Sequence, residues 1–177
     1  MITNFLGNER RMFPTFFSDE MVQKTKLADL QQTYGKRVVV KIKSRDRHFA
    51  LGNPYENDIS FVKTVLKNNS IEGDVLRDVD DDNLLISQAH SVIASPSTMC
   101  FKPIQMGIPT VILDRSGYIG AYENFYGFTS CEGTGRKIYG QLERGRDIEY
   151  IEDNIAGGVD YNSTEIYIDN LINTIGK

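Results

Sequence analysis

Short apolar runs alternate along the chain with longer segments in which apolar residues recur every three or four positions. The runs that have the character of strands are 2–6, 37–42, 74–76, 92–94 and 110–113. A continuous run such as Val38-Val39-Val40 is typical of a strand buried on both faces. The intervening segments near 18–34, 57–67, 82–90 and 98–106 have helical periodicity. The alternation predicts an α/β fold, a Rossmann-like parallel sheet with helices on both faces.

Local signals indicate where several helices begin and end. Ser-Asp-Glu at 18–20 predicts an N-cap with an acidic first turn, and Gly35 ends that helix. The aspartates at 80–82 predict a cap in the same way. Gly-Ile-Pro at 107–109 ends the helix before the fifth strand. The chain beyond residue 114 is rich in glycine and tyrosine, and only a last amphipathic helix from 163 or 164 to 175 is predicted there.

Length and composition predict one soluble domain over residues 1–177. The apolar fraction is 40%, the charged fraction is 25% and the net charge is −4, so no dominant basic surface points to nucleic acid. Cys100 and Cys131, with His48 and His90, do not form a disulfide framework or a zinc pattern. The first residues do not have the pattern of a signal peptide, and no apolar stretch is long enough for a transmembrane segment. We expect a cytoplasmic protein, with attachment to a membrane surface left open.

The most informative loop is Ser95-Pro96-Ser97-Thr98, which follows the fourth predicted strand. In open parallel sheets, ligands bind at the carboxyl ends of the strands, where loops lead into helix N-termini. Free backbone N–H groups, the helix dipole and the hydroxyls of Ser95, Ser97 and Thr98 suit the diphosphate of a nucleotide. The alternative is that Ser97 or Thr98 only caps its helix.

The loop belongs to a longer pattern: an acidic residue and a leucine pair at 82–85, an apolar strand and hydroxyl-rich turn at 91–98, and Gly-x-Pro with another apolar strand at 107–113. This pattern resembles the donor-binding, C-terminal domain of GT-B-fold glycosyltransferases, in particular the CDP-glycerol glycerophosphotransferase and capsule-polysaccharide transferase groups. The strand at 38–42 and the basic residues after it add to the likeness, which covers about residues 37–125.

The resemblance implies transfer of a sugar, or a sugar-like phosphate, from a nucleotide-sugar or CDP-alditol donor to an acceptor, with no metal or other cofactor. A chain of this length has no room for the acceptor-binding half, so a partner subunit or a separate N-terminal domain is expected. The leaving diphosphate would be stabilised electrostatically by Arg10, Arg11, Lys41, Arg45, Ser97 and Thr98. The alternative for Arg10 and Arg11 is a basic pair on the surface. The alternatives are a non-catalytic nucleotide-binding module and a relative of the sugar-nucleotide 2-epimerases.

The chain departs from the family pattern at two places. Where the family has histidine and proline after the second strand, this chain has Ser44 directly followed by Arg45. Where many GT-B enzymes have a carboxylate that binds the ribose, it has Lys102, which cannot accept hydrogen bonds. Lys102 would attract phosphate or a carboxylated sugar, or is a solvated surface lysine. The missing carboxylate also weakens the epimerase alternative.

The other candidates depend on position alone. Tyr118 and Glu123, in the glycine-containing loop after the fifth strand, are candidates to stack on a base and to bind the ribose, with a simple glycine turn as the alternative. His48 is the candidate catalytic base. The Asp-x-Asp matches within 78–82 are interpreted as helix capping rather than a metal site. The segment 133–137 lacks the spacing of a phosphate-binding P-loop and is predicted to be a mobile turn.

Overall fold

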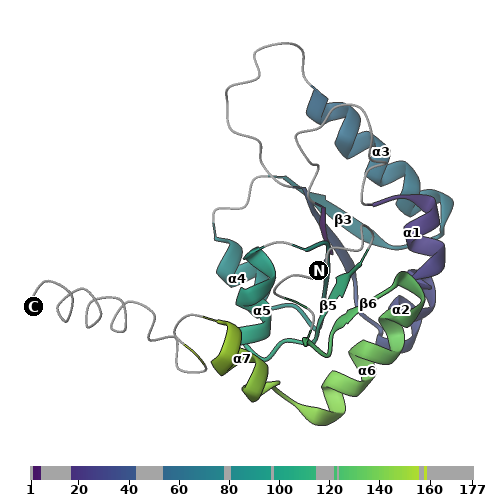
Figure 1. The fold of residues 1–177 in the computed structure, drawn as a ribbon. Coiled ribbons are helices and arrows are strands. Elements are labelled where there is room, and N and C mark those ends of the chain that lie inside the picture. Colours follow the sequence, from purple (N-terminus) through teal and green to yellow (C-terminus); the bar gives the residue numbers. More distant parts are fainter. Residues whose placement is uncertain are drawn as a thin grey trace, which may run out of the picture.

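The computed structural model of the chain describes residues 2–4, 17–42, 54–77, 81–96, 98–114, 122, 124–155 and 158, with only the backbone at 2–4, 54–58 and 98. Its centre is one sheet in which every strand pair is parallel (Figure 1). The six strands are β1 (Ile2–Asn4), β2 (Val38–Ile42), β3 (Gly73–Leu76), β4 (Val92–Ala94), β5 (Thr110–Leu113) and β6 (Phe128–Thr129). The protein is therefore an α/β protein with a parallel sheet.

The strands are ordered β3-β2-β1-β4-β5-β6 across the sheet. Strand β1 lies in the middle of the sheet. Strands β2 and β3 follow on one side of it, and β4, β5 and β6 follow on the other side. The order thus reverses between β1 and β4. In the register, Ile2 of β1 lies opposite Val40 of β2 and Ile93 of β4.

Alternate side chains of the central strands pack on opposite faces of the sheet. In β5, Val111 and Leu113 join one apolar core, while Ile112 joins the other. The first core lies beneath α1 (Asp19–Lys24), α2 (Leu27–Tyr34), α3 (Pro54–Asn68) and α6 (Thr134–Arg144). The second lies beside α4 (Asp82–Ser87), α5 (Phe101–Gln105) and α7 (Ile148–Asn154) (Figure 1). Burial on both faces explains the unbroken apolar runs of the sequence.

The predicted strands and most helix boundaries are confirmed to within a few residues. Ser18 is the N-cap of α1, and its Oγ accepts a hydrogen bond from the backbone N–H of Met21 at 3.2 Å. Gly35 is the left-handed C-cap of α2. Gly107, with φ of 74°, follows α5, and the N–H of Ile108 bonds back to the carbonyl of Pro103 at 2.9 Å. This closing hydrogen bond is typical of a glycine-terminated helix.

The prediction of one continuous helix from 18 to 34 is wrong. Helices α1 and α2 are separated at Thr25 and Lys26. The Thr25 hydroxyl donates to the carbonyl of Met21 at 2.8 Å, and it lies 3.1 Å from that of Val22. Lys26 has φ of 52°, in the left-handed region. Side-chain bonding to the backbone of the preceding turn competes with the helix, and the left-handed residue ends it.

The largest difference lies after β5, where β6, the short 3-10 helix η3 (Cys131–Gly133), α6 and α7 were not predicted. The segment 133–137 is not a mobile turn: Gly133 ends η3, and the next residues begin α6. A side chain at Gly133 would overlap the Thr129 hydroxyl, so this glycine serves close packing. The Thr134 hydroxyl donates to the Cys131 carbonyl at 2.7 Å. The helix predicted near 163–175 lies outside the described residues.

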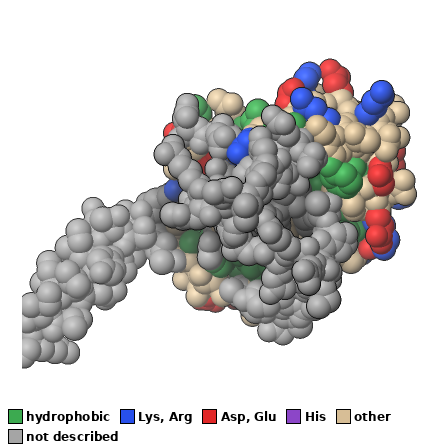
Figure 2. Space-filling model, turned by 90° about the horizontal axis from the view of Figure 1, so that it is seen from above, with side chains coloured by type: hydrophobic (Ala, Val, Ile, Leu, Met, Phe, Trp, Pro, Cys, Tyr) green, Lys and Arg blue, Asp and Glu red, His purple; other side chains and the backbone are tan. Residues whose placement is uncertain are grey.

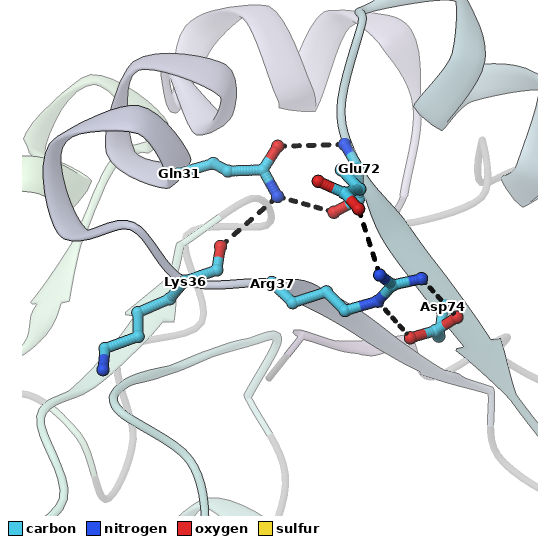
Figure 3. A network of polar contacts seen from close by, with 5 residues as sticks. All are labelled: Gln31, Lys36, Arg37, Glu72 and Asp74. Carbon is cyan, nitrogen blue, oxygen red and sulfur yellow. Dashed lines mark hydrogen bonds and ion pairs between the residues drawn. The ribbon is translucent and has the colours of Figure 1, made fainter.

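A polar network joins α2 to the amino-terminal ends of β2 and β3 (Figure 3). The amide of Gln31 exchanges hydrogen bonds with the backbone N–H and C=O of Glu72. The Arg37 guanidinium contacts both oxygens of Asp74, one of them at 3.0 Å, and the Glu72 carboxylate at 3.1 Å. The hydrogen bond from Arg37 holds the pKa of Asp74 below its ordinary value. None of the described helices has both the length and the apolar composition needed to cross a bilayer.

Candidate functional site

The carboxyl ends of the strands meet at one edge of the sheet, which we call the carboxyl edge. In open α/β sheets, ligands bind at this edge, close to the reversal of strand order. Figure 2, a view from above Figure 1, shows acidic and basic side chains interspersed on the described surface that it leaves visible. The described candidates nearest the reversal belong to the turn after β4, to β2 and to the start of α4.

The turn after β4 leads directly into a helix start. Ser95 and Pro96 are half-buried, and the 3-10 helix η1 (Thr98–Cys100) continues without a break into α5. The Sγ of buried Cys100 donates a hydrogen bond to the Ser95 carbonyl at 3.3 Å, and this bond stabilises the turn on its buried side. The backbone path therefore agrees with the predicted strand-turn-helix unit. The Ser97 residue and the Thr98 side chain lie outside the described residues.

Lys41, a predicted phosphate ligand, makes an ion pair that the sequence pattern did not predict. It alternates with buried Val40 and Ile42, so its side chain projects toward the opposite face, where α4 lies. Its Nζ is 3.1 Å from Oδ1 of Asp82, with side-chain exposures of 16% and 34%. Asp81 is the N-cap of α4, and its Oδ1 accepts from the N–H groups of Asn83 and Leu84 at 2.8 and 3.1 Å. Because Asp81 caps the helix, Asp82 is left to pair with Lys41.

The capping interpretation of the aspartate run is confirmed for Asp81. Residues 78–80 lie outside the described part of the chain. Where the chain is described, no three His, Cys, Asp or Glu side chains are grouped so that they could hold a metal ion. Lys102 lies in the first turn of α5 and is half-buried, with polar or electrostatic interactions of its own. It is therefore not a fully solvated surface lysine.

A cavity of about 270 Å³, which we call the acidic cavity, opens at the carboxyl ends of β5 and β6. Its polar lining is rich in hydrogen-bond acceptors, because three of its residues are carboxylates. Its lining residues are Glu20, Met21, Lys24, Asp114, Ser130, Cys131 and Glu132. The sequence pattern does not bring these residues together as a group. The available signal was Asp114, which directly follows a buried strand, but the other residues come from α1 and from the unpredicted β6–η3 segment.

Hydrogen bonds and charges set the ionisation of the acidic cavity. Lys24 pairs with Glu20 at 2.8 Å, and this hydrogen bond, more than the surrounding negative charge, raises the pKa of Lys24. The pKa of Glu132 is lowered, first by a backbone hydrogen bond within the residue and then by one from Ser130, with Lys24 contributing. Lys24 and Glu132 are therefore both charged at neutral pH. Because Lys24 is paired with Glu20 and the lining has three carboxylates to one lysine, the cavity favours ligand groups that donate hydrogen bonds over anionic groups.

The remaining predicted site residues lie outside the described part of the chain: Arg10, Arg11, Arg45, His48, Tyr118 and Glu123. Their roles stay predictions. Of the predicted site residues, Ser95 and Lys102 thus lie on the unit after β4, and Lys41 lies on β2 in contact with α4.

The fold class and the polar carboxyl edge together place the chain among α/β proteins with a parallel sheet. Comparison of the sequence with models of protein families gives no match, and no curated protein is significantly similar to it.

Proposed function

We propose that the chain is the donor-binding domain of a GT-B-type glycosyltransferase, which moves a sugar or sugar-like phosphate from a nucleotide diphosphate donor to an acceptor. The observation that carries the proposal is the strand-turn-helix unit after β4, which lies beside the reversal of an all-parallel sheet ordered β3-β2-β1-β4-β5-β6. This is the strand order of the dinucleotide-binding Rossmann fold, in which the ligand binds in the crevice at the reversal and its diphosphate lies at a helix N-terminus.

The charges at the carboxyl edge suggest that the diphosphate and the sugar hydroxyls of the donor bind at two different places. The turn 95–98 and Lys41 offer hydrogen-bond donors and a positive charge, which suit the diphosphate. Three carboxylates line the acidic cavity, which suits the hydroxyls of a ribose or sugar. Asp114 and Glu132 would thereby serve where Lys102 replaces the family's ribose-binding carboxylate. His48 stays the candidate base, and an acceptor-binding domain would complete the cleft.

The first test is a thermal-shift screen of the chain with UDP, GDP, CDP, CMP and dTDP and with their sugar or alditol conjugates. A ligand that binds only the folded state raises its stability, by about 2.7 kcal/mol at a concentration one hundred times its Kd. We expect one base to give a clear shift with its diphosphate and conjugates. If no member of the panel raises the melting temperature, the proposal that this chain by itself binds the donor is contradicted.

A double substitution tests the turn after β4. We expect S97A with T98A to weaken binding of the best nucleotide about five- to 150-fold, because two hydroxyl donors to the phosphates are lost, each worth about 0.5–1.5 kcal/mol. Isothermal titration calorimetry measures the affinity. The matched control is S60A with T64A on exposed positions of α3, which should leave the affinity unchanged. Unchanged affinity in the turn variant would mean that these hydroxyls only cap the helix.

Two substitutions of opposite sign test Lys41. K41Q should weaken nucleotide binding severalfold, because a positive charge near the phosphates is lost. D82N should strengthen it about two- to fivefold, because the Lys41 charge is no longer compensated at 3.1 Å. The same titration measures both. Equal affinities for K41Q, D82N and the unsubstituted protein would remove Lys41 from the proposed site.

The non-catalytic nucleotide-binding module stays the second candidate, and one observation favours it. Asp82 already compensates the charge of Lys41, so less positive charge is left to stabilise a leaving diphosphate. Incubation of the chain with the best donor, followed by assay of released nucleoside diphosphate, separates the two candidates. Binding without release, with candidate acceptors and partner domains supplied, favours the module.

A further inference from the structure

A second cavity lies at the opposite edge of the sheet, where the strands begin. Its volume is about 450 Å³, within the range of roughly 300–1,000 Å³ that is usual for small-molecule sites. It lies between α2 on one face and the end of α4 on the other. We call it the amino-edge cavity. Its lining includes Leu30, Tyr34, Lys36, Val38, Ala89 and His90.

The register of the sheet places this cavity at the end of its central strand. Ile2 of β1 pairs with Val40 and Ile93, whereas β2 begins at Val38. Val38 and Val39 therefore line the space beyond the described part of β1. Its walls include Leu30, which packs on the first core, and Ala89, which packs on the second. The interior is therefore mainly aliphatic.

An aromatic pair forms part of the wall. The rings of Tyr34 and His90 lie 4.7 Å apart, tilted by 40°. Burial, and then the charge of Lys36, lower the pKa of His90 below its ordinary value of 6.5. His90 is therefore uncharged at neutral pH and contributes an apolar ring edge rather than a positive charge.

The rim of the cavity carries one uncompensated positive charge. Arg37 is engaged by Asp74 and Glu72, and the Gln31 amide is used by the Glu72 backbone (Figure 3). Lys36 makes no ion pair with a described residue, and its carbonyl, not its ammonium, receives the hydrogen bond from Gln31. None of the described lining residues is a carboxylate. Glu72 and Asp74 lie outside the lining and are held by Arg37, so the Lys36 ammonium is the lining charge left to attract an anionic head group.

From this arrangement we propose that the amino-edge cavity binds a small amphipathic carboxylate. The aliphatic or aromatic body of the ligand fills the space between α2 and α4, and its carboxylate lies at the rim beside Lys36. The site is separate from the nucleotide site proposed at the carboxyl edge and does not depend on it. Ligand bound there bridges helices of both faces, so it stabilises the folded chain by mass action.

The test compares octanoate with 1-octanol, two ligands with the same alkyl body and different head groups, in a ¹H–¹⁵N NMR titration. We expect octanoate to shift the amide resonances around 30–39 and 85–93 and to bind more tightly than octanol. K36Q should weaken octanoate binding about two- to fivefold, as expected for the loss of one exposed charge, and should leave octanol unaffected. K63Q, which removes an exposed lysine of α3, is the matched control and should change neither affinity.

A second variant tests the cavity itself. A89F adds a ring at a lining position and should weaken binding of both ligands at least about tenfold, since steric clash is a strong discriminator. Its melting temperature and NMR spectrum report whether the fold is kept. The proposal is overturned if octanoate shifts no resonances at the amino edge. It is also overturned if K36Q, which needs no repacking, has the same affinities for octanoate and octanol as the unsubstituted protein.

Discussion

Replacing Gly127 by alanine is expected to destabilise the protein by about 3 kcal/mol or more, because the added carbon has no space. It would overlap the Thr110 carbonyl oxygen and the ring of Phe125. The Gly127 carbonyl accepts from the N–H of Ile112 at 3.0 Å, at the start of β6 beside β5. The Thr110 oxygen cannot move away freely, because it also accepts from the amide of Gln141 at 2.8 Å. Chemical denaturation measures the loss, which corresponds to roughly 6–12 °C in Tm.

The matched control is another glycine-to-alanine change in the same part of the chain. At Gly135, in the first turn of α6, the nearest atom to an added carbon is the flexible end of Leu30 at 3.3 Å. Alanine favours helix by up to about 1 kcal/mol over glycine, so G135A should be neutral or mildly stabilising. A G127A protein within about 1 kcal/mol of the unsubstituted one would contradict the described packing of β6 on β5.

The sequence predicts the first two thirds of the fold better than the last third, because glycines in the last third lie at close contacts that the sequence alone does not distinguish from turns. The strands up to β5 are apolar runs buried on both faces, and the pattern alone identifies them. Strand β6 has only two residues. In α6, Gly140 lies against the Tyr126 ring, whose hydroxyl would overlap any side chain there. The glycines that suggested a turn in this region are instead places where other groups pack closely.

The candidate site could be predicted only as far as local signals reach. The turn after β4 and the elements beside it come from one continuous stretch of sequence, and their strand-turn-helix structure is as expected. Lys41 and Asp82 are far apart in sequence, and their contact depends on the face of β2 from which Lys41 projects. The acidic cavity combines residues after β5 and β6 with α1. Contacts of this kind follow from strand order and register, which a single sequence does not specify.

The second large effect is expected at alkaline pH and comes from Tyr150. This side chain is only 3% exposed, and burial, more than the neighbouring charges of Cys100 and Asp147, raises its pKa to about 12. The ordinary value of 10.0 applies in the unfolded chain. Below pH 10 both states keep the proton. Between pH 10 and 12 the unfolded state loses it first, so stability falls as pH rises, by about 3 kcal/mol in total.

The variant Y150F removes this titration and is expected to lose less stability than the unsubstituted protein between pH 9.5 and about 11.5. Any constant cost of removing the hydroxyl is present at both pH values and cancels in the comparison. Urea denaturation at a series of pH values measures the difference. Y139F is the control for loss of a tyrosine hydroxyl outside the second core, because Tyr139 is 57% exposed and a hydrogen bond with Glu143, rather than burial, raises its pKa. Parallel pH profiles for Y150F and the unsubstituted protein would mean that the Tyr150 hydroxyl reaches water in the folded state, and that α7 does not bury it against the second core.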